Sequence, residues 1–425
     1  MIDNGDIREI SNNFSSGAAV RALDGGSWGF VSVDDSDSLD QALISARTLA
    51  KAAKNRFSRE NIALAPVDKP SLHDLPVMKE SPDDVPIEDK VKLLAEIEKS
   101  ARVDGISSTN AVYSESHVTV GYSSSEGLDC EYTLNRIGFA VSAIAQSGGN
   151  YQIGRESRFE IMGFEIFKKH DAFELARKAG TTAVELLSAK TPKAGTYPLI
   201  LDPELAGVFI HEAVGHAVEA DHVIEGNSIL EGKIGEQIAA PCITVYDDPS
   251  LHEFGYYPYD DEGAQSKKTV LIQDGVLKSF LHSRESAGKL GGTSRNARAQ
   301  GYSRPVIRMS NTFIAPDGAK FEEMLEEMKD GVYLIGSRGG QVNPGEGVFQ
   351  FNAERGFIVK NGELSTPLRD VSLSGNTLEI LNSVAMVGND LKLNSGRCGK
   401  AGQLVPVSDG APHVMVRSAL VGGSG

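Results

Sequence analysis

The 425-residue sequence contains few cysteines, one tryptophan and no long apolar run. Its three cysteines, Cys130, Cys242 and Cys398, lie far apart and cannot form a disulfide framework, which fits a reducing compartment. No stretch of about eighteen apolar residues is present, and the N-terminus has no basic region followed by an apolar segment. These absences argue against a membrane span and a secretion signal, so we expect a cytoplasmic protein.

Positive charge is also scarce. The chain has 42 Lys and Arg against 58 Asp and Glu, for a net charge of -16. A protein that binds DNA directly needs a basic patch, and the sequence shows none, so we expect no direct nucleic-acid contact. With 40% hydrophobic and 24% charged residues, the composition is that of a globular protein large enough for about two or three domains.

The N-terminal part alternates between helical and strand-like patterns. A period of two predicts strands at 18–23 and 28–33, and an antiparallel sheet from runs at 111–116, 118–122, 131–145 and 157–162. Helical spacing predicts helices at 39–54, 87–103 and 171–188, separated in part by a proline-rich extended connection at 56–86. One side of the first helix collects Leu39, Leu43, Ala46, Leu49, Ala50 and Ala53.

The stretch Thr191-Pro192-Lys193-Ala194-Gly195 is the best candidate for a domain boundary. Beyond residue 221 the pattern becomes short strands separated by Gly, Asn and Asp turns, with one amphipathic helix at 321–329. We therefore predict an α+β fold with two domains. An N-terminal α+β domain (1–190) precedes a β-rich C-terminal domain (191–425), which is barrel or sandwich-like.

Residues 202–221 are predicted to form one amphipathic helix with candidate catalytic side chains. Asp202 can cap it and Pro203 suits its first position, while apolar residues at three and four residue spacing fix one side in a core. His211, Glu212 and His216 fall on this helix. Two histidines and a carboxylate on an apolar helix indicate a divalent metal with a water-activating base beside it.

The two histidines stand at positions i and i+5, whereas those of the common zinc-protease helix stand at i and i+4. A regular α-helix would hold them about 140° apart, too far to share one ion. A single wide turn with a hydrogen bond between residues i and i+5 would return both to one face. We therefore predict such a bond between His211 and His216, with Gly215 lowering its steric cost.

A catalytic zinc normally has three protein ligands, so a third ligand must come from elsewhere. Cys398 lies among glycines and two cations, which favour close backbone approach and a thiolate. Cys242 opens an apolar strand and is more typical of a small buried hydrophobe, as is Cys130. The candidates that the residues leave open are Glu219, His222, Cys242, Cys398, Asp260, Asp261 and Glu262.

The acidic, aromatic loop at 257–263 allows two interpretations. It is either a solvated turn or a wall at the mouth of the site, where its carboxylates would hold a substrate amine or a histidine N–H.

Further motifs accompany the H-E-x-x-x-H helix. They are Gly25-Gly26-Ser27-Trp28-Gly29-Phe30, Tyr259-Asp260-Asp261-Glu262-Gly263, Arg308-Met309-Ser310-Asn311-Thr312 and Gly396-Arg397-Cys398-Gly399-Lys400 with Gln403. Together with the helix they strongly resemble the TldD/PmbA family, whose members are often called modulators of DNA gyrase. The TldD branch keeps the helix and the PmbA (TldE) branch generally lacks it, so the chain looks like the TldD type.

The resemblance implies a zinc metallopeptidase. It implies that His211, His216 and Cys398 bind the Zn²⁺ ion and that Glu212 is the general base. It also implies a dimer, either with a TldE/PmbA-like partner subunit or of two copies, which encloses a chamber that admits unfolded peptides.

We therefore expect metal-assisted hydrolysis of small or unfolded peptides. Two alternatives stay open: a regulatory protein-binding module in which the metal is structural, as the gyrase label suggests, and an amidase that acts on small molecules. The two histidines and a thiolate favour zinc but suit several ions.

Overall fold

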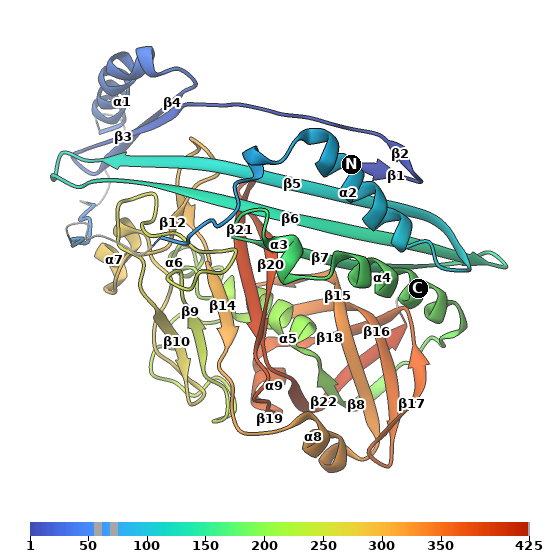
Figure 1. Ribbon diagram of the computed structural model, residues 1–425. Helices are drawn as coiled ribbons and strands as arrows, with labels where there is room; N and C mark the ends of the chain where they lie inside the picture. The colour runs from blue at the N-terminus through green and yellow to red at the C-terminus, as the bar shows by residue number, and fades with distance from the viewer. Residues whose placement is uncertain (55–61, 69–74, 424–425) are drawn as a thin grey trace.

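The computed structural model describes residues 1–54, 62–68 and 75–423. A long antiparallel sheet crosses one side of the molecule (Figure 1). Its strands follow the order β2 (Asp6–Ile7), β1 (Ile2–Asp3), β5 (Ile106–Ser123), β6 (Asp129–Ser147) and β7 (Asn150–Glu160). The predicted strands at 111–116 and 118–122 are thus parts of one strand, β5.

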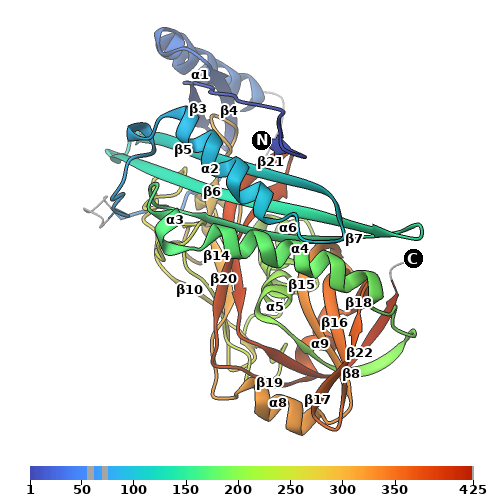
Figure 2. The same ribbon diagram turned by 45° about the vertical axis from the view of Figure 1, so that its right-hand side comes forward.

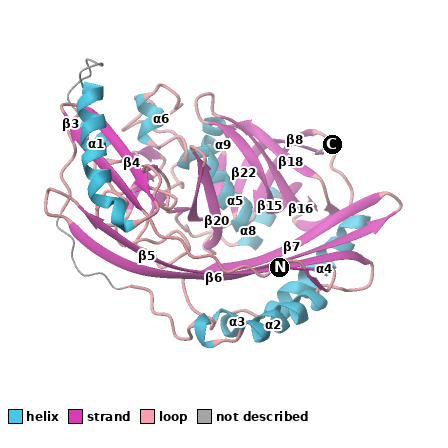
Figure 3. Cartoon of the chain, turned by 90° about the horizontal axis from the view of Figure 1, so that it is seen from above, coloured by secondary structure: helices cyan, strands magenta, loops and turns pink. Residues whose placement is uncertain are grey.

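Helices α2 (Ile87–Ser100), α3 (Ile166–Lys169) and α4 (Ala172–Ser188) cover one face of this sheet, and the C-terminal half of the chain lies against the other (Figure 3). A short 3₁₀ turn, η2 (Pro82–Asp84), precedes α2. Ile97 of α2, Ala176 of α4 and Phe139 of β6 are fully buried together in one apolar cluster. The period-two strands and the 3.6-period helices meet on their apolar faces, as their patterns predict.

A small unit stands at one end of the sheet, where α1 (Leu39–Lys54) packs on the hairpin of β3 (Ala18–Asp24) and β4 (Ser27–Val33). The 3₁₀ turn η1 (Ser36–Ser38) leads into α1. The buried side of α1 is formed by Ala42, Ala46 and Ala50, which allow close approach to the hairpin. The prediction that leucines share that side is wrong: the exposed large residues are Leu39 (39%), Leu43 (52%), Ile44 (60%) and Leu49 (50%).

The C-terminal half contains a closed barrel. Its ring runs β15 (Gly331–Asn343), β8 (Gly195–Leu201), β22 (Val414–Gly423), β18 (Val371–Asn376) and β16 (Val348–Lys360), and β16 pairs back to β15. The strands β17 (Glu363–Leu368) and β19 (Val384–Val387) and the helices α8 (Phe321–Met328) and α9 (Thr377–Asn382) flank it.

A mixed sheet lies beside the barrel. Its order is β11 (Val276–Leu277), β10 (Thr269–Gln273), β9 (Val245–Asp247), β14 (Asn311–Ile314), β21 (Gln403–Ala411) and β20 (Lys392–Lys400). The short pair β12 (Ala297–Arg298) and β13 (Val306–Ile307) and the helices α6 (Ala220–Ile224) and α7 (Arg284–Leu290) complete this region. In this order β20 is an edge strand.

Helix α5 (Pro203–Ile210) lies between the mixed sheet and the barrel (Figure 2). It contacts β14, β20 and β21 on one side and β15 on the other. Phe209 is 1% exposed, and its ring packs edge-on against Phe349 at 5.3 Å and Phe351 at 6.3 Å between centroids. The main apolar core of the chain therefore fixes the helix that leads directly into His211, Glu212 and His216.

The predicted fold class is confirmed: an N-terminal α+β part is followed by a β-rich part that contains a barrel. The helix predicted for 202–221 is shorter, because regular α-helix ends at Ile210 and α6 begins only at Ala220. The predicted connection at 56–86 lies partly outside the described residues. No described helix is long and apolar enough to cross a bilayer.

Replacement of Phe209 by alanine should destabilise the fold around α5. The substitution leaves a cavity between α5 and the barrel strand β16, and we expect a loss of about 3–5 kcal/mol in the free energy of unfolding, measured by urea titration. Phe209→Leu, which keeps most of the apolar contact, is the matched control and should lose less. A Phe209→Ala protein within about 0.5 kcal/mol of the wild type would contradict the role assigned to this contact.

Candidate metal centre

The start of α5 is fixed by Asp202. Its Oδ1 accepts a hydrogen bond from the Leu205 N–H at 2.9 Å and another from the Gly336 N–H at 3.0 Å, which ties the helix to β15. Pro203 occupies the first helical position, where no N–H donor is needed. A Cβ on Gly207 would lie 3.0 Å from Gly410 Cα, so the missing side chain lets α5 lie close to β21. The helix is therefore held at its start and along its length.

The helix widens where the histidines occur. Residues His211–Gly215 form a π-helical turn, and the His216 N–H donates to the His211 carbonyl at 3.3 Å. The predicted hydrogen bond between residues i and i+5 is thus confirmed. It returns the two imidazoles to the same side of the turn, with ring centroids 5.4 Å apart and ring planes at 88°.

Gly215 is needed here for space. Its backbone does not have a positive φ, so it is not a conformational exception. A Cβ at this position would lie 1.9 Å from Sδ of Met309, which is fully buried. The absent side chain lets the wide turn pack against β14 and the residues before it.

Cys398 reaches the histidines from β20, 182 residues further along the chain than His216. Its Sγ lies 3.7 Å from His216 Nε2, and one ligand atom from each of His211, His216 and Cys398 lies within 4.8 Å of the others. His211 and Cys398 are 5% and 3% exposed. The structure thus brings together the three residues that the resemblance implied as ligands.

The pKa values of Cys398 and His211 are shifted toward their charged forms although both side chains are buried. Burial raises the pKa of the Cys398 thiol, but hydrogen bonds and charge interactions with His211 and His216 outweigh it and lower the pKa to about 5. Burial lowers the pKa of His211, but Cys398 outweighs that effect and the net shift is upward. The thiol is therefore held as a thiolate, the form that binds metals.

The geometry fits a shared tetrahedral ion. Typical Zn–S and Zn–N bonds of about 2.3 and 2.0–2.1 Å place sulfur and nitrogen about 3.6 Å apart at the tetrahedral angle. The observed Sγ–Nε2 distance of 3.7 Å agrees. His211 Nδ1 is buried with no hydrogen-bond partner among the described residues. Two imidazoles and a thiolate suit zinc and leave a fourth position open.

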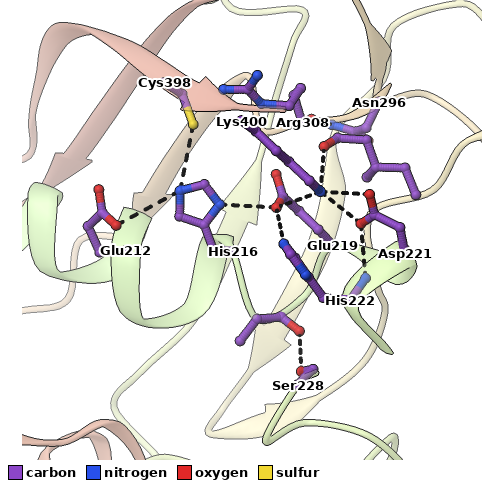
Figure 4. Close-up of polar contacts among 12 residues, drawn as sticks. Glu212, His216, Glu219, Asp221, His222, Ser228, Asn296, Arg308, Cys398 and Lys400 are labelled. Atoms are coloured by element: carbon purple, nitrogen blue, oxygen red, sulfur yellow. Dashed lines mark hydrogen bonds and ion pairs between the residues drawn. The ribbon is translucent and has the colours of Figure 1, made fainter. Parts of the chain in front are cut away.

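Glu212 lies next to this cluster and is not part of it. Its Oε2 is 3.9 Å from His216 Nε2 (Figure 4). The side chain of Glu212 is 27% exposed, against 14% for His216. A carboxylate beside the cluster with access to solvent is placed to exchange a proton with a reacting molecule.

The other candidates for a third ligand lie elsewhere. Glu219 follows the end of the wide turn, and its carboxylate contacts His216 Nδ1 at 3.0 Å, on the opposite side of the ring from Cys398. His222 contacts Glu219 and not the cluster. Cys242 is half-buried against the main core, as expected for a small hydrophobe.

The carboxylates of the acidic loop at 257–263 stabilise the surrounding backbone. Asp260 accepts from the N–H groups of Glu262, Ala264 and Ala297. Asp261 accepts from the Ala299 N–H at 2.7 Å. The hydrogen bonds that Asp260 and Asp261 accept come from backbone amides, so the structure does not support the hypothesis that this loop holds a histidine N–H of the site.

Glu262, the third acid of this loop, joins distant segments. Its Oε1 binds Arg21 of β3 at 2.6 Å, and its Oε2 accepts from the Arg284 N–H at 2.6 Å. This carboxylate therefore ties the N-terminal hairpin to the start of α7.

One acid near the site was missed from the sequence. Asp409 of β21 pairs in register with Asn394 of β20, on the strand face that also carries Cys398. Burial raises the pKa of Asp409 to about 6, with His211 opposing and Glu212 adding to the shift. The turn at Ala401-Gly402, a glycine-containing two-residue connection, is the signal that could have predicted the hairpin and this shared face.

Three family models match the chain in order. The PmbA/TldA metallopeptidase domain 1 matches residues 1–54, the central domain of the same family matches 80–187, and its C-terminal domain matches 194–423. The last of these contains His211, Glu212, His216 and Cys398.

Several known proteins are similar to this chain over nearly its whole length. A protein named metalloprotease from Methanothermobacter thermautotrophicus is 43% identical over all of this chain and 92% of its own length. A zinc metalloprotease TldD homolog from Saccharolobus solfataricus is 30% identical over 98% of this chain and 92% of its own length. The crystal structure of a candidate modulator of a DNA gyrase from Thermotoga maritima shares the fold, with a TM-score of 0.82 and 24% identity over 99% of this chain and 92% of that one.

Gly215→Ala should disturb the wide turn through Met309. The added methyl group must displace the Met309 side chain, and we expect a loss of about 1–3 kcal/mol in the free energy of unfolding of the metal-free protein. The matched variants are Met309→Ala and the double variant, measured by urea titration. If the clash is real, the double variant loses less than the sum of the single losses, and additive losses would show that the two residues do not compete for space.

Proposed function

We propose, from the premise that this chain belongs to the PmbA/TldD family of metallopeptidases, that it is a zinc-dependent enzyme that hydrolyses small or unfolded peptides. The observation that carries the proposal is the convergence of His211, His216 and Cys398 to within 4.8 Å, with the Glu212 carboxylate beside them. Apolar packing does not explain two imidazoles and a thiolate together, since His211 and Cys398 are buried and burial of polar groups is costly.

Zinc is the ion that the donors favour. We assign His211, His216 and Cys398 as its ligands, which leaves the fourth position open for water or substrate. An ion held there would supply Lewis-acid polarisation of a carbonyl and would lower the pKa of water to about 7. The name of the Saccharolobus solfataricus relative also includes zinc.

Glu212 is proposed as the general base. Its carboxylate lies beside the ligand nitrogen of His216 and keeps access to solvent, so it can take a proton from the attacking water. The same carboxyl group then returns that proton to the leaving amine. The wide turn makes this arrangement possible, since it holds Glu212 next to the histidines.

An extended peptide is the proposed substrate. In the mixed sheet, β20 carries Cys398 and pairs only with β21 among the described strands, so no described strand pairs with its outer edge. A peptide that adds to this edge would be held by backbone hydrogen bonds next to the cluster. Such binding recognises the backbone more than the side chains, which suits unfolded peptides of varied sequence.

A dimer is the proposed assembly, either with a TldE/PmbA-like subunit or of two copies. The exposed leucines and isoleucine of α1 support a partner, because such an apolar helix face is unusual on a free surface. The residues on it are Leu39, Leu43, Ile44 and Leu49.

Glu212→Gln tests the proposed chemistry. The amide keeps the size of the side chain but cannot accept the proton, so we expect a fall in peptide turnover of at least about 100-fold. Zinc content, measured by atomic emission, should stay at the wild-type level because Glu212 is not a ligand. Cleavage of an unstructured peptide, followed by mass spectrometry, gives the rate.

Cys398→Ser is the companion variant and should lose the metal itself. A Glu212→Gln protein that keeps near-normal turnover would refute the assignment of the base, and unchanged zinc in Cys398→Ser would refute the assignment of the third ligand.

A further inference from the structure

His216 is held at both ring nitrogens by residues outside its own turn. Its Nε2 faces Cys398 Sγ at 3.7 Å, and its Nδ1 contacts Glu219 Oε2 at 3.0 Å (Figure 4). The side chain of Glu219 is 0% exposed. The fully buried carboxylate of Glu219 therefore binds the His216 nitrogen that faces away from Cys398.

Several cationic or N–H groups converge on one oxygen of that carboxylate. Glu219 Oε2 lies 3.0 Å from His216 Nδ1, 3.0 Å from Lys400 Nζ and 3.6 Å from His222 Nε2. The other oxygen, Oε1, is buried without a hydrogen-bond partner. The carboxylate is thus oriented by what binds Oε2 alone.

The acidic cluster of Glu219, Asp221 and His222 has the spacing of a second metal site. The ammonium group of Lys400 lies within it, however, at 3.0 Å from Glu219 Oε2 and 2.7 Å from Asp221 Oδ2. Lys400 also donates to the Ile307 carbonyl at 3.2 Å. A side-chain cation therefore already neutralises these carboxylates, and we do not assign an ion there.

One strand supplies both contacts. Cys398 and Lys400 are two residues apart in β20, so their side chains leave the same face of the strand. Cys398 meets Nε2 of His216, and Lys400 meets the carboxylate that binds Nδ1. The backbone of Glu219 is also fixed, because the Leu281 N–H donates to the Val218 carbonyl and the Ala220 N–H donates to the Leu281 carbonyl.

We propose that Glu219, held in place by Lys400, is the positioning residue of His216. It accepts a hydrogen bond from Nδ1–H, which fixes the tautomer with the lone pair on Nε2 and aims that nitrogen at Cys398. This inference rests on the proposed metal site, which it extends by naming the residues that orient one ligand. Such an outer carboxylate commonly contributes to metal affinity.

The experiment compares zinc affinity in Glu219→Gln, Asp221→Asn and the wild type, each as the metal-free full chain. Zn²⁺ dissociation constants come from competition with a fluorescent chelator. Loss of the carboxylate should raise the constant about 10–100-fold in Glu219→Gln. Asp221→Asn removes a contact of Lys400 and leaves the bond to His216, so it should change the constant by less than about threefold.

The unfolding midpoint of each metal-free protein separates positioning from stability. A Glu219 that is only structural would lower this midpoint and leave the zinc affinity of the folded protein unchanged, which would overturn the proposal. An equal loss of affinity in Asp221→Asn would overturn it as well. Should Glu219→Gln not fold, Lys400→Met keeps Glu219 but frees it, and a weaker affinity supports the proposal while an unchanged one overturns it.

The two proposals fail in different ways. A wild-type protein that binds no zinc would remove the metal site itself and with it the proposed function. A wild type that binds zinc no more tightly than Glu219→Gln leaves the metal site in place and overturns only the role of Glu219.

Discussion

The candidate site depends on one hydrogen bond, from the His216 N–H to the His211 carbonyl. The two histidines stand at positions i and i+5, and only a widened turn can place both imidazoles on one side. That turn is kept in place because α5 is capped by Asp202 and anchored by Phe209, while Gly215 leaves room for Met309. The geometry of the site therefore depends on the packing of the main core around α5.

The second constraint is the register of β20 and β21. Because side chains alternate across a strand, the register that aims Cys398 at His216 also aims Lys400 at Glu219. A slip of one residue would turn both away together. The outer edge of the same strand, with which no described strand pairs, is where we place an extended peptide, so a single edge strand would link metal binding, ligand orientation and substrate binding.

The sequence predicted the fold class and the widened turn. The five-residue spacing predicted the wide turn, and the change from helical to strand periods predicted the fold class. The limit of the helix was not predictable, because the bridge between Glu219 and Leu281 that replaces its last turn is a tertiary contact. The leucines of α1 were assigned to the wrong side, since the alanines allow closer packing on the hairpin. Cys398 was one of seven candidates that the residues left open, and only the family resemblance singled it out, because its position 182 residues further along the chain than His216 gives no sign of their contact. The boundary between domains 1–190 and 191–425 stays a prediction.

The central claim is that two histidines of a widened helix and one cysteine of an edge strand bind the same ion. X-ray absorption at the zinc edge of the purified protein tests it most directly, because sulfur and nitrogen ligands give separate shells. The account predicts one sulfur at about 2.3 Å and at least two nitrogens at about 2.0–2.1 Å. A coordination shell of nitrogen and oxygen alone, with zinc bound at full occupancy, would contradict it.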